Sequence, residues 1–323
     1  MRVLVTEPIV DSAIAYLRKH AEVTVGKPGQ FSSEEALIKA LPGYDALLSM
    51  LSNPVSGDVL KAADSLKIVA NYAVGYNNID TETARTLKIR VSNTPDVLTD
   101  ATADLAFGLI LGAGRKFTAA EKHLRDGNFK GWEPLGFMGL ELSGSTLGII
   151  GMGRIGQAVA KRAMGFNMKV IYHNRSRLPE ETERSLNALY TEDVKKLVTE
   201  SDVISLHCPL TPQTRHLIDS EMISIMKPHT ILVNTARGPV VDEEALAEAL
   251  HTGKIGGAGL DVFEEEPLVH PRLLSAPNCM ILPHIGSATI TAREAMGKLA
   301  AESIVSVLKG KDDSEIPNLI VSF

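Results

Sequence analysis

The stretch TLGIIGMGRIGQAVAKRAMG, residues 146–165, joins an apolar strand, a glycine-rich turn and the start of a helix. Its glycines Gly151, Gly153 and Gly156 follow the pattern GxGxxG. In a dinucleotide-binding fold the first glycine permits a tight turn, the second lets the backbone approach a pyrophosphate, and the third lets helix and strand pack closely. The helix N-terminus adds amide donors and a favourable dipole for phosphate. The alternative is a tight turn that binds no ligand.

Short apolar runs alternate with amphipathic stretches on both sides of this turn. The runs expected to form strands before it are 3–6, 22–25, 46–49, 68–71 and 90–92, with helices at 9–19, 33–41 and 57–63. A second series of strands is expected at 147–150, directly before the turn, and at 170–173, 202–207, 230–236, 258–263 and 280–283 after it. This alternation predicts an α/β fold with Rossmann-like, doubly wound parallel sheets.

Two long helices are expected where the two series of strands meet. One runs over 100–126, with Thr99 or Asp100 as N-cap and Gly127 as its stop. The other runs over 289–309 and ends at Gly310. Such helices could carry the chain between two domains, with 316–321 returning to the first. Two consecutive domains are the alternative, and the pattern alone leaves both open.

Length and composition limit the class of protein. The 323 residues are about twice the usual length of one domain, so two domains are expected. The net charge of -6 argues against nucleic acid or an anionic membrane as the main partner. Two cysteines, Cys208 and Cys279, are too few for a disulfide scaffold or a cysteine zinc site, and no metal is expected. The sequence shows no signal-peptide pattern and no membrane-length apolar run, which predicts a cytoplasmic protein.

The residues after the strand at 170–173 indicate which dinucleotide binds. An NAD-binding fold usually has Asp or Glu there, about 20 residues beyond the glycines, to hold the ribose hydroxyls. Here the loop reads Asn174, Arg175, Ser176 and Arg177, without a carboxylate. Arginine binds a 2′-phosphate well, so we expect NADP(H) in preference to NAD(H). The alternatives are use of both cofactors, or an exposed arginine pair that binds no phosphate.

Three reactive side chains follow the later strands. Arg237 follows the strand at 230–236, Glu266 follows the strand at 258–263, and His284 follows the strand at 280–283. The carboxyl ends of parallel strands share one edge, where ligands bind, so the three can converge there. Taken singly, each has an ordinary alternative: a surface ion pair, part of a solvated acidic run, or a structural histidine.

Six motifs in order make the whole chain recognisable. They are TPDVLTDATADLAFGLIL, GMGRIG, HCPLTPQT, NTARGPVVDEEAL, GLDVFEEEP and LPHIGSAT. Together they resemble the NAD(P)-dependent D-isomer-specific 2-hydroxyacid dehydrogenases, over nearly the full length. NYAVGYNNID and the NRSR loop are most similar to the glyoxylate/hydroxypyruvate reductases and 2-ketogluconate reductases.

The resemblance implies a catalytic set of Arg237, Glu266 and His284. Arg237 would bind the carboxylate of a 2-oxoacid and polarise its carbonyl group. His284 would donate a proton to the carbonyl oxygen as hydride arrives from the nicotinamide. Glu266 would bond to the other imidazole nitrogen and fix the tautomer. Of the three consecutive glutamates, the family pattern selects the one directly before proline.

The resemblance also implies binding residues. Asp261 would accept a hydrogen bond from the nicotinamide carboxamide. Cys208 would line the cofactor site as a packed side chain and not act as a nucleophile. Ser287 would touch substrate or cap the helix at 289–309. Backbone amides of two segments, Met50-Leu51 and Val74-Gly75, would hold the substrate carboxylate. The implied cofactor contacts are Thr102, Gly151, Gly153, Arg154, Ile155, Gly156, Asn174, Arg175, Ser176, Arg177, Cys208, Pro209, Thr214, Thr235, Ala236, Asp261 and Gly286. The implied substrate contacts are Leu51, Val74, Gly75, Arg237, His284 and Ser287.

The resemblance implies a domain plan and an activity. Residues 1–99 and 288–323 would form a discontinuous, flavodoxin-like substrate domain, and 100–287 an inserted nucleotide domain. A homodimer would form through the helix at 100–126 and the segment after it. Residues 129–138 would extend toward the partner's active site, or form an ordinary surface loop as the alternative. The expected activity is NADPH-dependent reduction of glyoxylate, hydroxypyruvate and 2-ketogluconate to D-2-hydroxyacids. The alternatives are a dinucleotide-sensing, corepressor-like binding protein, or a relative acting on another small anion.

Overall fold

The computed structural model describes residues 1–316 and 318–323, which group into two compact units. Unit 1 combines Met1–Leu98 with Ser287–Phe323, and unit 2 is Thr99–Gly286. The chain of unit 1 is therefore interrupted by the whole of unit 2. Pro317, inside the segment 316–321 expected to return to the first domain, lies outside the described residues.

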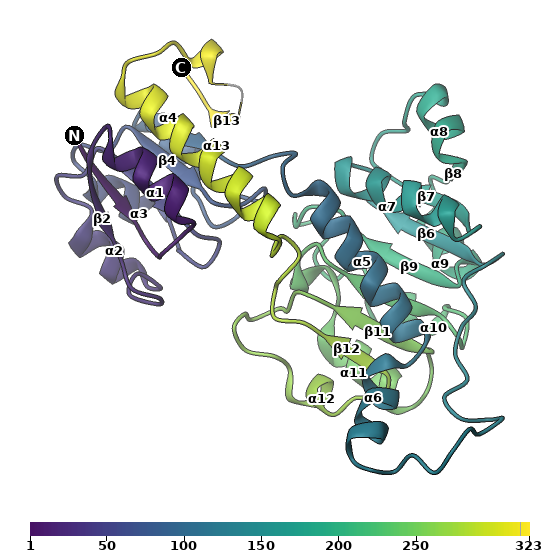
Figure 1. Ribbon diagram of the computed structural model, residues 1–323. Helices are drawn as coiled ribbons and strands as arrows, with labels where there is room; N and C mark the ends of the chain where they lie inside the picture. Colours follow the sequence, from purple (N-terminus) through teal and green to yellow (C-terminus); the bar gives the residue numbers. More distant parts are fainter. Residues whose placement is uncertain (317) are drawn as a thin grey trace. The chain divides into compact units, whose positions relative to one another are not determined.

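Unit 1 is a sheet with helices packed on it (Figure 1). Its elements are β1 (Arg2–Val5), α1 (Asp11–Arg18), β2 (Glu22–Val25), α2 (Glu34–Ala40), β3 (Ala46–Ser49), α3 (Gly57–Ala62), β4 (Ile68–Asn71), α4 (Thr81–Thr86), β5 (Arg90–Ser92), α13 (Ile290–Leu308), η2 (Asp313–Glu315) and β13 (Leu319–Val321). The strand order is β13-β5-β4-β3-β1-β2, parallel except for β13, which pairs antiparallel with β5. Every residue of β3 and β4 is buried, as in a parallel sheet covered on both faces. Leu37, Leu47 and Val69 belong to the core beneath α2, α3 and α4, and α13 packs beside α1 (Figure 1).

Unit 2 is a parallel sheet between two layers of helices (Figure 1). Its elements are α5 (Thr99–Gly114), α6 (Phe117–Arg125), β6 (Thr146–Ile150), α7 (Arg154–Gly165), β7 (Lys169–His173), α8 (Glu180–Leu186), β8 (Ala188–Tyr190), α9 (Val194–Glu200), β9 (Val203–Leu206), α10 (Ser220–Ser224), β10 (Ile231–Asn234), η1 (Gly238–Val240), α11 (Glu243–His251), β11 (Gly257–Leu260), α12 (Pro271–Leu274) and β12 (Cys279–Ile281). The strand order is β12-β11-β10-β9-β6-β7-β8. One core lies against α5 and α7 and a second against α9, α10 and α11. The strand order reverses between β6 and β9, the place where such sheets bind ligands.

These two sheets confirm the predicted α/β class with Rossmann-like, doubly wound domains. The strands expected at 22–25, 46–49, 68–71 and 90–92 have those bounds in the structure. The three-residue edge strand β8 was not predicted, because ALY is too short to show an alternating pattern.

The prediction of one continuous helix over 100–126 is wrong. The chain forms α5 and α6 instead, and Lys116 between them has a left-handed φ of +56°. The carbonyl of Gly114, which a continuous helix would use for residue 118, accepts the amide of Leu140 at 2.8 Å. A Cβ on Gly139 would stand 2.2 Å from that carbonyl oxygen, so the returning chain lies directly against the break.

Two predicted helix caps are also wrong. Thr99 and Asp100 are the first residues of α5 rather than its cap. The cap of α13 is Thr289, whose hydroxyl accepts from the amide of Ala292 at 3.1 Å, and not Ser287. Ser287 contributes its carbonyl to the amide of Thr289. The stops at Gly127 and Gly310 have positive φ, as the sequence predicts.

Candidate functional site

The glycine turn lies at the carboxyl end of β6, with Gly153 as the N-cap of α7. Gly151 has a φ of +97°, and a Cβ there would stand 2.5 Å from the amide nitrogen of Cys208. A Cβ on Gly156 would stand 2.2 Å from the carbonyl oxygen of Gly151. Both positions therefore need glycine for the packing of the protein itself.

Gly153 differs, because no described atom lies within 4 Å of a Cβ built on it. The packing of the chain therefore does not require glycine there, and the space beside it is open. This space lies at the start of α7, whose first amides have no partner within the helix. An open cradle beside a helix N-terminus fits a pyrophosphate.

The two arginines of the loop after β7, Arg175 and Arg177, differ in their partners. Arg177 donates to both carboxylate oxygens of Glu183, at 2.9 and 2.8 Å, and Glu183 also accepts from the hydroxyl of Tyr172 at 2.6 Å. These hydrogen bonds lower the pKa of Glu183 to about 2. Arg175 is exposed and, among the described residues, has no hydrogen-bonding partner. Asn174 accepts from the amide of Met152 and bonds to the carbonyl of Ser176, and so links this loop to the glycine turn.

The paired carboxylate and imidazole are the centre of the site. His284 Nδ1 lies 2.7 Å from Glu266 Oε2. Glu266 Oε1 accepts from the amide of Phe263 at 3.0 Å, which fixes the carboxylate. Burial raises the pKa of Glu266, but the bond to His284 and the amide outweigh it, and the pKa lies below its usual value. Among the described residues, His284 Nε2 has no hydrogen-bonding partner, so it can bond to a substrate atom.

Backbone contacts hold His284 in an unusual conformation. Its φ is +53°, a left-handed value that is rare for a residue other than glycine. Asp261, 1% exposed, accepts from the amides of Ile285 and Gly286, both at 2.7 Å. The hydroxyl of Thr102 donates to the carbonyl of Gly286 at 3.2 Å. These bonds hold the residues directly after His284, and burial raises the pKa of Asp261.

Arg237 lies between β10 and η1 on a tightly held loop. Asn234 Nδ2 donates to the carbonyl of Arg237 at 2.8 Å, and Arg237 Nη1 donates to the carbonyl of Ala236 at 2.7 Å. Burial lowers the pKa of Arg237, while the carboxylate of Glu266 raises it. A Cβ on Gly238 would stand 1.8 Å from the carbonyl carbon of Phe263. Glycine there brings the loop of Arg237 against the loop of Glu266.

The remaining nucleotide-side residues in unit 2 mostly shape loops. Thr214 donates to the carbonyl of Pro209 at 2.7 Å and accepts from the amide of Thr211 at 2.8 Å. Thr235 lies 3.5 Å from Nδ1 of His207. Burial raises the pKa of the Cys208 thiol to about 11, so the side chain is suited to packing and not to acting as a nucleophile.

Two supporting residues were not predicted as part of the site. Glu264 accepts from the amide of Glu243 at 3.0 Å and lies 2.8 Å from His216 Nε2. Glu264 therefore ties down the loop that presents Glu266 and is not the carboxylate that pairs with His284. His207 is the second, because burial lowers its pKa to about 4 and keeps it neutral beside Thr235. Neither could be found from spacing alone.

The substrate-side candidates lie in unit 1. Leu51 follows β3, and Val74 and Gly75 follow β4, the neighbouring strand. Their loops are therefore at one edge of the sheet, the carboxyl edge. Asn71, Asn78 and Asn93 bond to the carbonyls of these loops.

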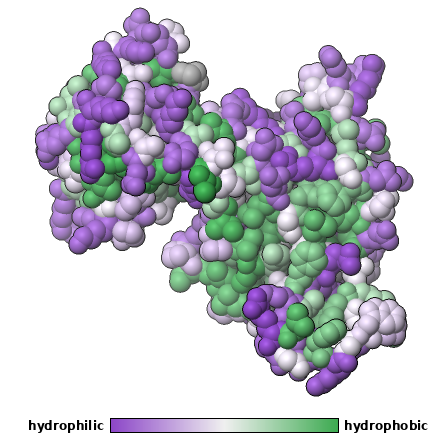
Figure 2. All heavy atoms as spheres, in the orientation of Figure 1, coloured by the Kyte–Doolittle hydropathy of each residue, from purple (hydrophilic) through white to green (hydrophobic). Residues whose placement is uncertain are grey.

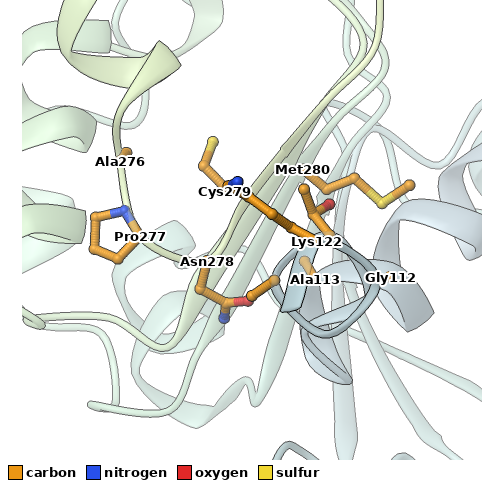
Figure 3. Close-up of a pocket in the computed structure, with 10 residues that line it drawn as sticks. Gly112, Ala113, Lys122, Ala276, Pro277, Asn278, Cys279 and Met280 are labelled. Carbon is orange, nitrogen blue, oxygen red and sulfur yellow. The ribbon is translucent and has the colours of Figure 1, made fainter. Parts of the chain in front are cut away.

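A separate pocket lies apart from these side chains. It has a volume of about 190 Å³ and is bounded by α5, α6 and the start of β12, with Lys122 and Cys279 in its lining (Figure 3). None of the candidate catalytic residues lines it.

Among the described residues, no group of three or more His, Cys, Asp or Glu side chains is arranged to hold a metal ion. Every helix in residues 1–316 and 318–323 is too short or too polar to cross a membrane.

Comparisons with known proteins agree with this arrangement. The model of the D-isomer specific 2-hydroxyacid dehydrogenase NAD binding domain matches residues 107–286. A glyoxylate reductase of Thermococcus onnurineus is 47% identical, covering 99% of this chain and 96% of the relative.

Two solved structures are similar over almost all of the chain. A Thermus thermophilus protein has a TM-score of 0.92 at 44% identity, covering 99% of this chain and 100% of its own. An NADPH-dependent glyoxylate/hydroxypyruvate reductase of Sinorhizobium meliloti, solved with NADP and malonate, has a TM-score of 0.86 at 32% identity, covering 100% and 99%.

Proposed function

The chain belongs to the D-isomer specific 2-hydroxyacid dehydrogenase family and is an oxidoreductase, and on that premise we propose that it reduces small 2-oxoacids to D-2-hydroxyacids. Its nucleotide-binding domain identifies the cofactor as a nicotinamide dinucleotide. The substrates we propose are glyoxylate and hydroxypyruvate, with 2-ketogluconate as a larger third. The observation that supports this most is the 2.7 Å contact of His284 with Glu266, close to the partly buried Arg237.

The proposed chemistry divides the work among these three side chains. When bound, the reduced nicotinamide supplies the hydride. Nε2 of protonated His284 gives a proton to the carbonyl oxygen of the substrate. Glu266 holds Nδ1 and stabilises the imidazolium, so that Nε2 carries the transferable proton. Arg237 binds the carboxylate and polarises the carbonyl, and its partial burial strengthens both interactions.

The proposed cofactor site extends from the glycine turn to the loop after β7. Gly151, Gly153 and Gly156, with Arg154 and Ile155 at the start of α7, would hold the pyrophosphate. Thr102, Cys208, Pro209, Thr214, Thr235, Ala236, Asp261 and Gly286 would line the rest of the dinucleotide.

NADP(H) is the proposed preferred form. The loop of Asn174, Arg175, Ser176 and Arg177 has no carboxylate that would repel a 2′-phosphate. Arg175 is the primary phosphate ligand in this proposal, because Arg177 is already bound to Glu183 at 2.8 and 2.9 Å. The Sinorhizobium meliloti relative, which is NADPH-dependent, supports the same choice.

We also propose that the protein is a homodimer. The helix α6 has no buried residue, and its Phe117 and Leu124 are 51% and 59% exposed. In the segment 129–138, Trp132 is 85% exposed, and apolar side chains (green) gather on the face of unit 2 that Figure 2 shows. A second copy would cover this apolar surface.

A panel of 2-oxoacids tested with NADPH and NADH checks the proposal. We expect glyoxylate and hydroxypyruvate to cause loss of absorbance at the nicotinamide band, with a larger kcat/KM for NADPH. A clear preference for NADH would refute the assignment of Arg175. Absence of turnover with every 2-oxoacid would refute the reductase activity.

A further inference from the structure

Buried asparagines lie beneath the two unit 1 loops that contain Leu51 and Gly75. Asn53, Asn71 and Asn93 are 1%, 0% and 6% exposed, and Asn78 is half-buried. Burying an amide side chain costs free energy unless its polar atoms are bonded. The partners of these four side chains therefore indicate what the asparagines do.

Two of the asparagines hold the loop after β3. Asn78 Nδ2 donates to the carbonyls of Met50 and Asn53, each at 3.1 Å. Asn53 Oδ1 accepts from the amide of Met50 at 2.7 Å and from the hydroxyl of Thr6 at 2.6 Å. The peptide groups on both sides of Met50 are therefore held by side chains.

The loop after β4 is held by three further donors. The amide of Thr94 donates to the carbonyl of Ala73 at 2.9 Å. Asn93 Nδ2 donates to the carbonyl of Val74 at 2.8 Å, and Asn71 Nδ2 donates to the carbonyl of Gly75 at 2.7 Å. Three consecutive carbonyls thus have fixed directions.

Fixing a carbonyl also fixes the next amide, because C=O and N–H point to opposite sides of a trans peptide. The amides of Leu51, Val74, Gly75 and Tyr76 are therefore directed away from the donors that hold the carbonyls. Within the described residues, none of these four amides has a hydrogen-bond acceptor. Unpaired backbone amides held in fixed directions are suited to an anion such as a carboxylate.

We infer that Asn71, Asn78 and Asn93 are positioning residues that set the backbone amides for the carboxylate of the substrate. This inference rests on the proposed function, since it assigns the anion to the 2-oxoacid. The asparagines do not touch the substrate; they act through the carbonyls of Met50, Val74 and Gly75. The carboxylate subsite is in this view preformed within unit 1, before the cofactor binds.

Substitution of the asparagines tests the inference through the two KM values. In Asn78→Ala and Asn93→Ala, we expect the KM for glyoxylate to rise about tenfold, because one amide donor to a charged group is misdirected. The KM for NADPH should stay within about twofold, because its proposed contacts are in unit 2. Asn93→Asp keeps the volume of the side chain but removes the donor, so it should raise the KM for glyoxylate at least as much as Asn93→Ala.

Tyr44→Phe is the matched control. It removes one hydrogen bond of the same unit, from the tyrosine hydroxyl to Thr24 Oγ1 at 2.9 Å, at the start of β3 and away from both loops. We expect its KM for glyoxylate to equal that of the wild type. Thermal unfolding checks that each variant is folded at the assay temperature.

The outcomes separate the inference from the proposed function. An active wild type with unchanged KM for glyoxylate in all asparagine variants would overturn the inference alone, as would a normal KM in Asn93→Asp. Equal increases in both KM values would also overturn it, because that pattern indicates general loss of structure. A wild type that does not oxidise NADPH with glyoxylate would overturn the proposed function, and the inference with it.

Discussion

Replacing Glu266 with Gln should remove most of the activity while keeping the shape of the site. In the wild type, one carboxylate oxygen accepts from Phe263 at 3.0 Å and the other lies 2.7 Å from Nδ1 of His284. Glutamine has one acceptor and one donor. If its oxygen faces Phe263, its NH₂ faces Nδ1 and excludes the protonated imidazole. If its oxygen faces His284, its NH₂ opposes the amide of Phe263.

The size of this effect follows from the bond that is lost. A hydrogen bond to a charged group contributes about 1.5–3 kcal/mol. Each 1.36 kcal/mol changes a rate by about tenfold, so kcat/KM for glyoxylate should fall by about 10- to 150-fold. Ionised Glu266 stabilises the proton donor, and its pKa is lowered from the ordinary value. The wild type should therefore keep its activity to a lower pH than an unperturbed glutamate allows, and Glu266→Gln should lose that acidic limb.

The assay is the steady-state pH profile of glyoxylate reduction with NADPH. Glu265→Gln is the matched control, because it removes the same charge from an exposed neighbour that does not contact His284. We expect the control to behave as the wild type. A Glu266→Gln enzyme within about threefold of the control, with the same acidic limb, would refute the assigned pairing.

Three further changes have defined expected results. Gly153→Ala should leave the Tm unchanged, because a Cβ there meets open space, yet raise the KM for NADPH about tenfold or more if the backbone approaches the pyrophosphate. Gly156→Ala should lower the Tm, since its Cβ would stand 2.2 Å from the carbonyl oxygen of Gly151 and overpacking costs about 1–3 kcal/mol. Burial raises the pKa of Asp202, but hydrogen bonds from Lys227 and His229 bring it down to about 2 from 3.8. Asp202→Asn should therefore lose about 2 kcal/mol at pH 7, a contribution that the wild type itself loses as the pH falls from about 4 to about 2, measured by thermal unfolding.

The sequence predicted the sheets well because their strands are continuous apolar runs. IVAN and ALLS are buried on both faces, so their pattern depends on little besides burial. The break after α5 could not be predicted in the same way. It depends on Leu140, distant in sequence, which takes the carbonyl of Gly114. Contacts of this kind leave no local periodicity.

The candidate site was likewise predictable from the sequence only in part. The positions of Arg237, Glu266 and His284 at strand ends follow from parallel topology, although only the family resemblance selected Glu266 from its acidic run. The structure distinguishes the glutamates by their partners: Glu264 bonds to the amide of Glu243, and Glu266 pairs with His284. The ion pair of Arg177 with a glutamate six residues later was missed, because a loop sequence does not show which arginine already has a partner.

Reduction of glyoxylate by the wild type and by His284→Gln, each with NADPH, tests the central claim most directly. Glutamine can still bond to Glu266 but cannot deliver a proton, so the account predicts rapid loss of NADPH absorbance with the wild type. It predicts at least about a hundredfold slower loss with the variant, with NADPH binding retained. A variant that turns over glyoxylate at close to the wild-type rate would contradict the assignment of His284 as the proton donor.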